Sequence, residues 1–283
     1  MNKKLYISIF TIFFSFFIFS QIETPQPSPL SKLSQKVGLV NVDIEYSRPS
    51  ARQRIVFGSL IPFGEKWRTG ANQNTKITFD NDVIIENKLI RKGTYSMYTI
   101  PNLNSWSLIF YKKYDNWGLP KEWDDDLVEI EVSANPITLP FKIETFTISL
   151  NNLNNNGCTL DMFWENTLVS FNINSLTQQK VVESINNTLI DNPSSQDYYK
   201  AAVFYFEENL DIKKAKLWID KCSELRKNFP YWMLSQKALI YHAYGSVDES
   251  IEIAKLGLKL ANETNIKDSI KTLNETLIHV SNN

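Results

Sequence analysis

Histidine and cysteine are scarce in this chain of 283 residues, which has two of each. Both histidines, His242 and His279, follow residue 175. The preceding part therefore has no histidine for a Ser–His or Cys–His catalytic pair or for a zinc site. The two histidines also lack metal-ligand spacing, and we expect each to be a helix-surface or packing residue. Cys158 and Cys222 fall in segments of different character, and we expect buried small residues rather than a disulfide.

Strongly basic stretches are also missing. Lys3 and Lys4 lie in an N-terminal segment that we argue below to be cleaved. The remaining chain has 28 basic residues (30 − 2) and 31 acidic ones, a net charge near −3. A nucleic-acid-binding protein would need a basic face, so the charge pattern excludes that class of partner. The chain also lacks a glycine-rich phosphate loop and a nucleophile elbow. These absences favour a protein without metal or cofactor, and they weigh against an enzyme without excluding one.

The one long apolar run lies at the N-terminus. Two lysines precede it, Leu5 to Phe19 is broken only by three hydroxyl residues, and the small residue Ser20 follows. This order is typical of a secretory signal peptide, and the run is shorter than the roughly 20 residues that span a bilayer. We therefore predict a signal peptide at residues 1–20, cleaved near Gln21, with no later membrane span and no lipidated cysteine. The mature protein is expected in the periplasm or at the cell surface.

A proline-rich, extended leader is predicted for residues 21–33, followed by an all-β domain at residues 34–174. Val40 to Tyr46 alternates strictly between apolar and polar residues, the pattern of a half-buried strand. Further short strands are predicted at residues 75–79, 83–85, 95–100, 106–111, 127–132, 146–150, 159–164 and 168–173. A hairpin turn is predicted at Asn154–Gly157. So many short strands without intervening helices indicate an antiparallel sandwich or barrel.

Helical periodicity begins after Ser175 and continues to the C-terminus, which makes the expected fold α+β with two domains. Start and stop residues are clear: Ser194 or Ser195, Asp211 and Pro230 begin helices, and Gly245 ends one. Ile212, Ala215, Ile219, Cys222 and Leu225 recur 35 residues later as Val247, Ser250, Ala254, Gly257 and Leu260. This period resembles tetratricopeptide repeats. Residues 175–283 are therefore predicted to contact a protein or peptide partner.

Four segments of the β domain carry a family resemblance. They are YSRPS (residues 46–50), WRTGAN (67–72) with Thr75, GTYSMYTIP (93–101) and WG (117–118). The string resembles the DUF2911 family of exported proteins of unknown function, common in Bacteroidetes, over about residues 26–173. The resemblance implies export and an all-β domain, and it implies no reaction.

Six residues of these segments form the candidate ligand site: Arg48, Trp67, Arg68, Asn72, Thr75 and Trp117. An arginine beside aromatic rings can stack on them and still present its planar fork to a carboxylate or phosphate. We therefore expect a cleft for an anionic small ligand or a glycan. The alternative is structural, with an arginine paired to Glu65 or Glu165 and tryptophan filling the core.

A cluster of acidic residues provides a second candidate site. Glu122 and Asp124–Asp126 cluster beside Trp123, either as an acidic turn before a strand or as part of a hydrolytic site.

Three hypotheses for the function follow from these features, in this order of preference. The first is a non-catalytic interaction protein whose helical tail contacts a partner while the β domain docks or binds a ligand. The second is a carbohydrate-binding module. The third is a hydrolase acting on glycans through carboxylates such as Asp124, Asp125 or Glu165.

Overall fold

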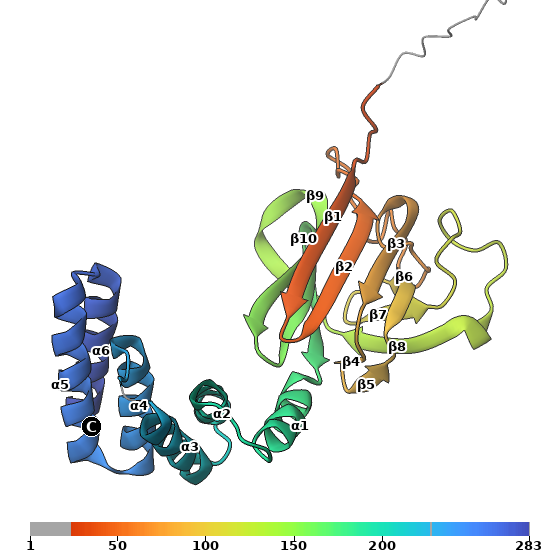
Figure 1. The fold of residues 1–283 in the computed structure, drawn as a ribbon. Helices are drawn as coiled ribbons and strands as arrows, with labels where there is room; N and C mark the ends of the chain where they lie inside the picture. The colour runs from red at the N-terminus through yellow and green to blue at the C-terminus, as the bar shows by residue number, and fades with distance from the viewer. Residues whose placement is uncertain (1–23, 227, 283) are drawn as a thin grey trace, which may run out of the picture.

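The computed structural model describes residues 24–226 and 228–282, in which antiparallel strands precede six helices (Figure 1). The α+β class predicted from the change in periodicity is confirmed. The predicted signal peptide at residues 1–20 lies outside the described residues. Within the described part, no helix is both long enough and apolar enough to cross a membrane.

The strands form two antiparallel sheets, one in the order β1-β2-β3-β6-β7-β8 and the other in the order β5-β4-β10-β9. The first sheet consists of β1 (Leu30–Val37), β2 (Val40–Ser47), β3 (Ala71–Phe79), β6 (Gly93–Ile100), β7 (Trp106–Tyr111) and β8 (Val128–Ala134). The second consists of β4 (Val83–Ile85), β5 (Lys88–Ile90), β9 (Ile137–Asn154) and β10 (Gly157–Ser175). A 3-10 helix, Asp125–Leu127, precedes β8.

Alternation of apolar and polar side chains along a strand explains why the sheets bury one face. In β2, Val42, Ile44 and Tyr46 are buried, whereas Asp43 is exposed between them. One apolar core draws buried side chains from both sheets, with Trp106, Trp164 and several phenylalanines among the largest. This shared core holds the two sheets together.

The second sheet differs from the prediction in the extent of its strands: β9 is much longer than the expected 146–150, and β5 was not among the expected strands. The strands expected at residues 159–164 and 168–173 are parts of a single 19-residue strand, β10. The register of β10 against β9 shifts on either side of Glu165, whose φ of 52° is left-handed. A bulge of this kind bends a strand without ending it. The predicted hairpin turn is confirmed, because Asn154 pairs with Gly157 and the chain reverses between them.

The six helices are α1 (Thr177–Thr188), α2 (Ser195–Glu207), α3 (Ile212–Leu225), α4 (Tyr231–Tyr244), α5 (Val247–Thr264) and α6 (Lys267–Asn282). The predicted boundaries of the middle helices are confirmed. Ser194 forms a capping box with Asp197, and the Asp211 side chain accepts hydrogen bonds from two backbone amides of α3. Pro230 precedes α4, and Gly245 ends it with a left-handed φ of 99°.

The 35-residue offset relates α3 to α5, which begin at Ile212 and Val247. Both helices bury small or apolar residues at the corresponding positions, Ala215, Ile219 and Cys222 in α3 and Ser250, Ala254 and Gly257 in α5. Gly257 has no room for a side chain, because a Cβ there would lie 2.8 Å from Leu273 Cδ2 and 3.1 Å from Leu234 Cβ. The recurring small residues therefore let neighbouring helices approach closely.

Polar contacts fasten the first two helices to the sheets. The backbone amide of Leu39, in the β1–β2 turn, donates to Thr177 Oγ1 at 2.9 Å. Asn155, in the β9–β10 turn, donates to Glu208 at the end of α2 at 2.7 Å, and Asn156 donates to the same carboxylate. In Figure 1 the later helices then lead away from the sheets, with α5 and α6 farthest along the chain.

Candidate functional site

Trp67 is part of the protein core. Its backbone pairs with that of Thr99 in β6, at 2.7 and 2.9 Å, and this pairing turns the side chain inward. The indole is 6 % exposed, stacks on Trp164 with ring centres 5.7 Å apart, and donates from Nε1 to the Gly70 carbonyl at 2.9 Å. Its polar atom is therefore satisfied inside the protein, as the structural alternative expects for a core tryptophan.

Three other predicted residues make internal hydrogen bonds. Arg48 donates from Nε to the Phe146 carbonyl at 3.0 Å and from Nη2 to the Thr147 hydroxyl at 2.6 Å. Asn72 donates to the Ser28 carbonyl at 3.1 Å, and the buried Thr75 hydroxyl donates to the Thr69 carbonyl at 2.6 Å. The bonds of Arg48 and Asn72 join segments that are far apart in the sequence, whereas that of Thr75 closes a local turn.

A separate hydrogen-bond network shows what holds the loop containing Trp117. Gly118 has a φ of 70°, and its carbonyl accepts from the Tyr98 hydroxyl at 3.1 Å and from Asn116 Nδ2 at 2.7 Å. Burial raises the pKa of Tyr98, so the hydroxyl stays protonated and able to donate. Trp117, one residue earlier, is 69 % exposed. The network therefore anchors a loop that presents a tryptophan to solvent.

Arg68 lies beneath this loop. A Cβ on Gly118 would be 3.1 Å from Arg68 Nη1, so the absence of a side chain there makes room for the guanidinium. Arg68 Nε is buried and has no hydrogen-bond partner among the described residues. The fold thus brings Arg68 and Trp117 into one neighbourhood, while Trp67 and Thr75 are core residues.

The candidate carboxylates have structural partners. Asp124 accepts from the Asp126 amide at 3.0 Å, and Asp125 accepts from Trp123 Nε1 at 2.9 Å, which together shape the turn before β8. Glu165 accepts from the Val56 amide at 3.1 Å and lies 3.3 Å from the Lys142 ammonium. Arg48, whose partners are Phe146 and Thr147, is not held by Glu165.

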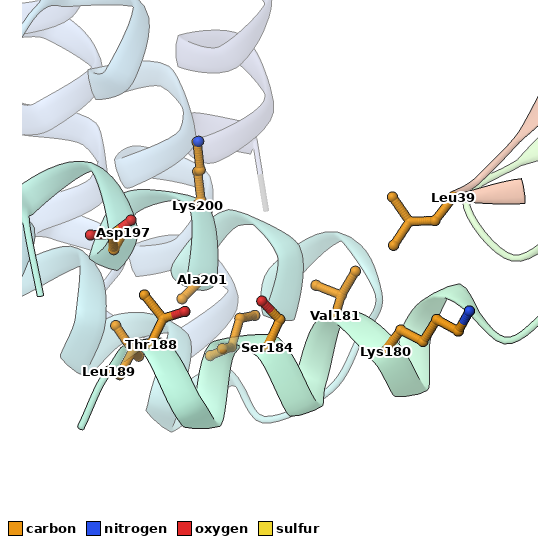
Figure 2. Close-up of a pocket in the computed structure, with 10 residues that line it drawn as sticks. Leu39, Lys180, Val181, Ser184, Thr188, Leu189, Asp197, Lys200 and Ala201 are labelled. Carbon is orange, nitrogen blue, oxygen red and sulfur yellow. The ribbon is translucent and has the colours of Figure 1, made fainter. Parts of the chain in front are cut away.

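A pocket of about 310 Å³ lies where the sheets meet the helices (Figure 2). Leu39 reaches toward it from the β1–β2 turn, α1 forms one wall, and Asp197, Lys200 and Ala201 of α2 complete it. Its lining residues are Leu39, Lys180, Val181, Ser184, Ile185, Thr188, Leu189, Asp197, Lys200 and Ala201. Asp197 belongs to the capping box, whose hydrogen bonds from Ser194 lower the pKa of the carboxyl. This carboxylate is therefore already occupied in holding the start of α2.

A second pocket, of about 230 Å³, lies between α4 and α6. Trp232 is its most prominent residue, because the indole is 48 % exposed and meets Tyr199 of α2 edge-on with ring centres 5.5 Å apart. Gln236, one turn further along α4, has a buried Oε1 without a hydrogen-bond partner among the described residues. The remaining lining residues are Tyr231, Ser235, Asp268, Ser269, Thr272 and Leu273. We name this pocket the Trp232 groove.

Other side chains of α4 are occupied by α3. Lys237 donates to Ser223 at 2.9 Å, and the Tyr241 hydroxyl donates to the Asp220 carboxylate. Burial lowers the pKa of Lys237 and raises that of Tyr241, as expected for groups enclosed between two helices. Trp232 and Gln236, by contrast, line an open groove.

The family model for a protein of unknown function, DUF2911, matches residues 28–173. The chain belongs to the DUF2911 family. Nothing among the curated proteins or among the solved structures matches it.

The DUF2911 match covers the two sheets, from Ser28 to within two residues of the end of β10, and it ends before the helices. Arg48, Trp67, Arg68, Asn72, Thr75 and Trp117 all lie within the matched region. The Trp232 groove lies outside it, and the sequence reasoning did not identify that groove. The available signal was Tyr231-Trp232 directly after Pro230, which places two large aromatic residues in the first turn of a helix.

Proposed function

We propose that this DUF2911 protein is an exported, non-catalytic binding protein of the bacterial envelope. Its helical region binds a protein or peptide partner in the Trp232 groove, and its β domain docks against a partner or binds a ligand. The signal-peptide pattern of residues 1–20 supports export to the periplasm or the cell surface. Two sheets around a common core support a β-sandwich as the first domain.

One observation carries the proposal. The Trp232 groove combines a half-exposed indole with a buried, unpaired amide oxygen on Gln236. A buried acceptor without a partner costs about 1–3 kcal/mol, and a ligand recovers part of that cost when the Gln236 amide turns toward the groove and accepts a hydrogen bond from it. Tryptophan is also enriched among the residues that contribute most to binding energy at interfaces. The groove therefore suits a donor-bearing segment such as a peptide backbone.

The arrangement of the helices supports the same function. Helices α2 and α3 pack as one pair and α4 and α5 as the next, with α6 against α4 and α5. This order and the 35-residue offset support a tetratricopeptide-like unit of two repeats followed by a closing helix. Helical repeats commonly present a continuous binding surface, and the groove lies between the first helix of the second pair and the closing helix.

Substitution of Trp232 tests the proposal. The wild-type protein and the Trp232→Ala variant are immobilised and exposed to envelope extract, and captured proteins are compared quantitatively. Loss of a central tryptophan costs about 2 kcal/mol or more, so affinity for a partner bound in the groove should fall roughly 30-fold. Tyr244→Ala provides a matched control, because Tyr244 is an aromatic residue of the same helix with a similar exposure of 44 %.

The expected result is a partner retained by the wild-type and Tyr244→Ala proteins and lost by Trp232→Ala. Equal capture by all three proteins would remove the Trp232 groove from the binding surface. Far-UV circular dichroism of each variant verifies that the helices are intact.

Glycan binding by the β domain is a second candidate, favoured by the 69 % exposure of Trp117 next to Gly118, which packs against Arg68. An exposed indole can stack on a sugar face, and the guanidinium can donate to hydroxyl or carboxylate groups. A glycan array probed with wild-type and Trp117→Ala protein tests it. Glycan signals that persist unchanged in the variant would exclude Trp117 from the site.

A further inference from the structure

The fold brings the two histidines of the chain together. His242 is in the last turn of α4 and His279 is in the last turn of α6, 37 residues further along the sequence. Their ring centres are 5.4 Å apart and the ring planes meet at 62°. No sequence motif links them, so this proximity depends on how α4 packs against α6.

Contacts along the two helices fix the pair. The Tyr231 hydroxyl faces the Ser269 hydroxyl at 3.5 Å near the start of both helices, and Ser235 and Thr276 share a 2.8 Å hydrogen bond further along. Helices α4 and α6 therefore run in the same direction side by side. The two imidazoles lie at the end of this seam, beside the buried cluster that contains Ala238 and Val280.

The pair has the chemistry of a partial metal site. His279 is exposed, so an ion can approach from its side of the pair, and His242 Nδ1 is buried without a hydrogen-bond partner among the described residues. Imidazole nitrogen is a good ligand for zinc, copper and nickel. Two imidazoles bound to one tetrahedral ion through bonds of roughly 2.1 Å have ring centres roughly 5 Å apart, close to the separation found here.

We propose that His242 and His279 form a two-histidine binding site for a divalent transition-metal ion, which links the end of α4 to the end of α6. Among the described residues, no cluster of three or more His, Cys, Asp or Glu side chains could hold a metal. Water therefore completes the coordination, and the site binds its ion reversibly. Affinity follows the general order for nitrogen ligands, with Cu²⁺ bound more tightly than Ni²⁺ or Zn²⁺.

Binding would stabilise the folded helical region. A metal ion that bonds to both rings holds α6 against α4, and it binds the folded chain in preference to the unfolded one. The last turns of both helices should then exchange their amide hydrogens more slowly when the ion is present.

Calorimetric titration of the protein, prepared without a polyhistidine tag, tests the proposal with Cu²⁺, Ni²⁺ and Zn²⁺. The expected result is one Cu²⁺ ion per chain, with His242→Gln and His279→Gln each weakening binding at least tenfold. Lys271→Gln is the control, because Lys271 is an exposed residue of α6 two turns before His279 and should leave binding unchanged. Hydrogen exchange should show metal-dependent protection of the end of α6 in the wild-type protein and no such protection in His279→Gln.

The site is absent if none of the three ions binds to the wild-type protein in this titration. It is likewise absent if both glutamine variants bind Cu²⁺ as tightly as the wild-type protein, since the ion would then be held elsewhere. His279 is exposed, so His279→Gln should fold, and circular dichroism verifies this. A histidine pair that only packs would leave the exchange pattern unchanged on addition of metal.

Discussion

Replacement of each of two tryptophans of the β domain by alanine should change stability by very different amounts. Trp67 and Trp117 both lie in loop segments between strands and both belong to the predicted ligand site. Trp67 is 6 % exposed and Trp117 is 69 % exposed. We therefore expect Trp67→Ala to destabilise the protein strongly and Trp117→Ala to have little effect on its free energy of unfolding.

The size of the effect follows from the contacts. Trp67 packs against Phe57, Phe146 and Trp164, with ring centres 6.1, 4.9 and 5.7 Å away. Truncation of a buried tryptophan to alanine costs about 3–5 kcal/mol, and the loss of the hydrogen bond to Gly70 adds about 1 kcal/mol. Surface substitutions usually stay within about 0.5 kcal/mol. These losses add up to about 4–6 kcal/mol, so the melting temperature should fall by roughly 8–24 °C for Trp67→Ala, at about 2–4 °C per kcal/mol.

Urea unfolding followed by far-UV circular dichroism at the β-sheet signal measures both variants. Trp67→Phe serves as a graded control, because it keeps an aromatic ring in the core and should fall between the wild-type protein and Trp67→Ala. The reasoning is refuted if Trp67→Ala costs less than about 1 kcal/mol, a value far below core truncations. It is also refuted if Trp117→Ala is as destabilising as Trp67→Ala.

Two further predictions concern thiols and acid. Cys158 and Cys222 are free and buried, and burial raises the pKa of Cys158 to about 11 and also raises the pKa of Cys222. Neither thiol should therefore react with a thiol reagent at pH 8 in the native protein, and both should react after denaturation. A prompt reaction of the native protein would contradict this. The pKa of Asp82 is lowered, chiefly by the hydrogen bond from the Lys92 amide and then by Arg91. The ionised carboxylate therefore stabilises the folded protein at pH values above its ordinary pKa of 3.8, and this stabilisation is lost as the pH falls through the lower pKa of the folded state. The advantage of the wild-type protein over Asp82→Asn in urea unfolding should therefore be constant above about pH 5 and shrink toward pH 2, and an advantage unchanged at pH 2 would show that the carboxylate makes no such contribution.

Local patterns in the sequence were sufficient for most of the secondary structure. Strict alternation identified β2, and the capping residues Ser194, Asp211 and Gly245 located helix ends, because each of these signals acts within a few residues of backbone. The 35-residue recurrence likewise related α3 to α5, since both need small residues where neighbouring helices touch.

The environment of each side chain could be determined only from the tertiary structure. Trp67 and Trp117 look alike in the sequence, yet one pairs with β6 and enters the core while the other is exposed to solvent in a loop. The bulge at Glu165 merged two expected strands, because pairing with β9 continues past it. His242 and His279 became neighbours only through the packing of α4 against α6. Burial and proximity depend on contacts between residues far apart in the chain, and a local pattern does not encode which faces meet.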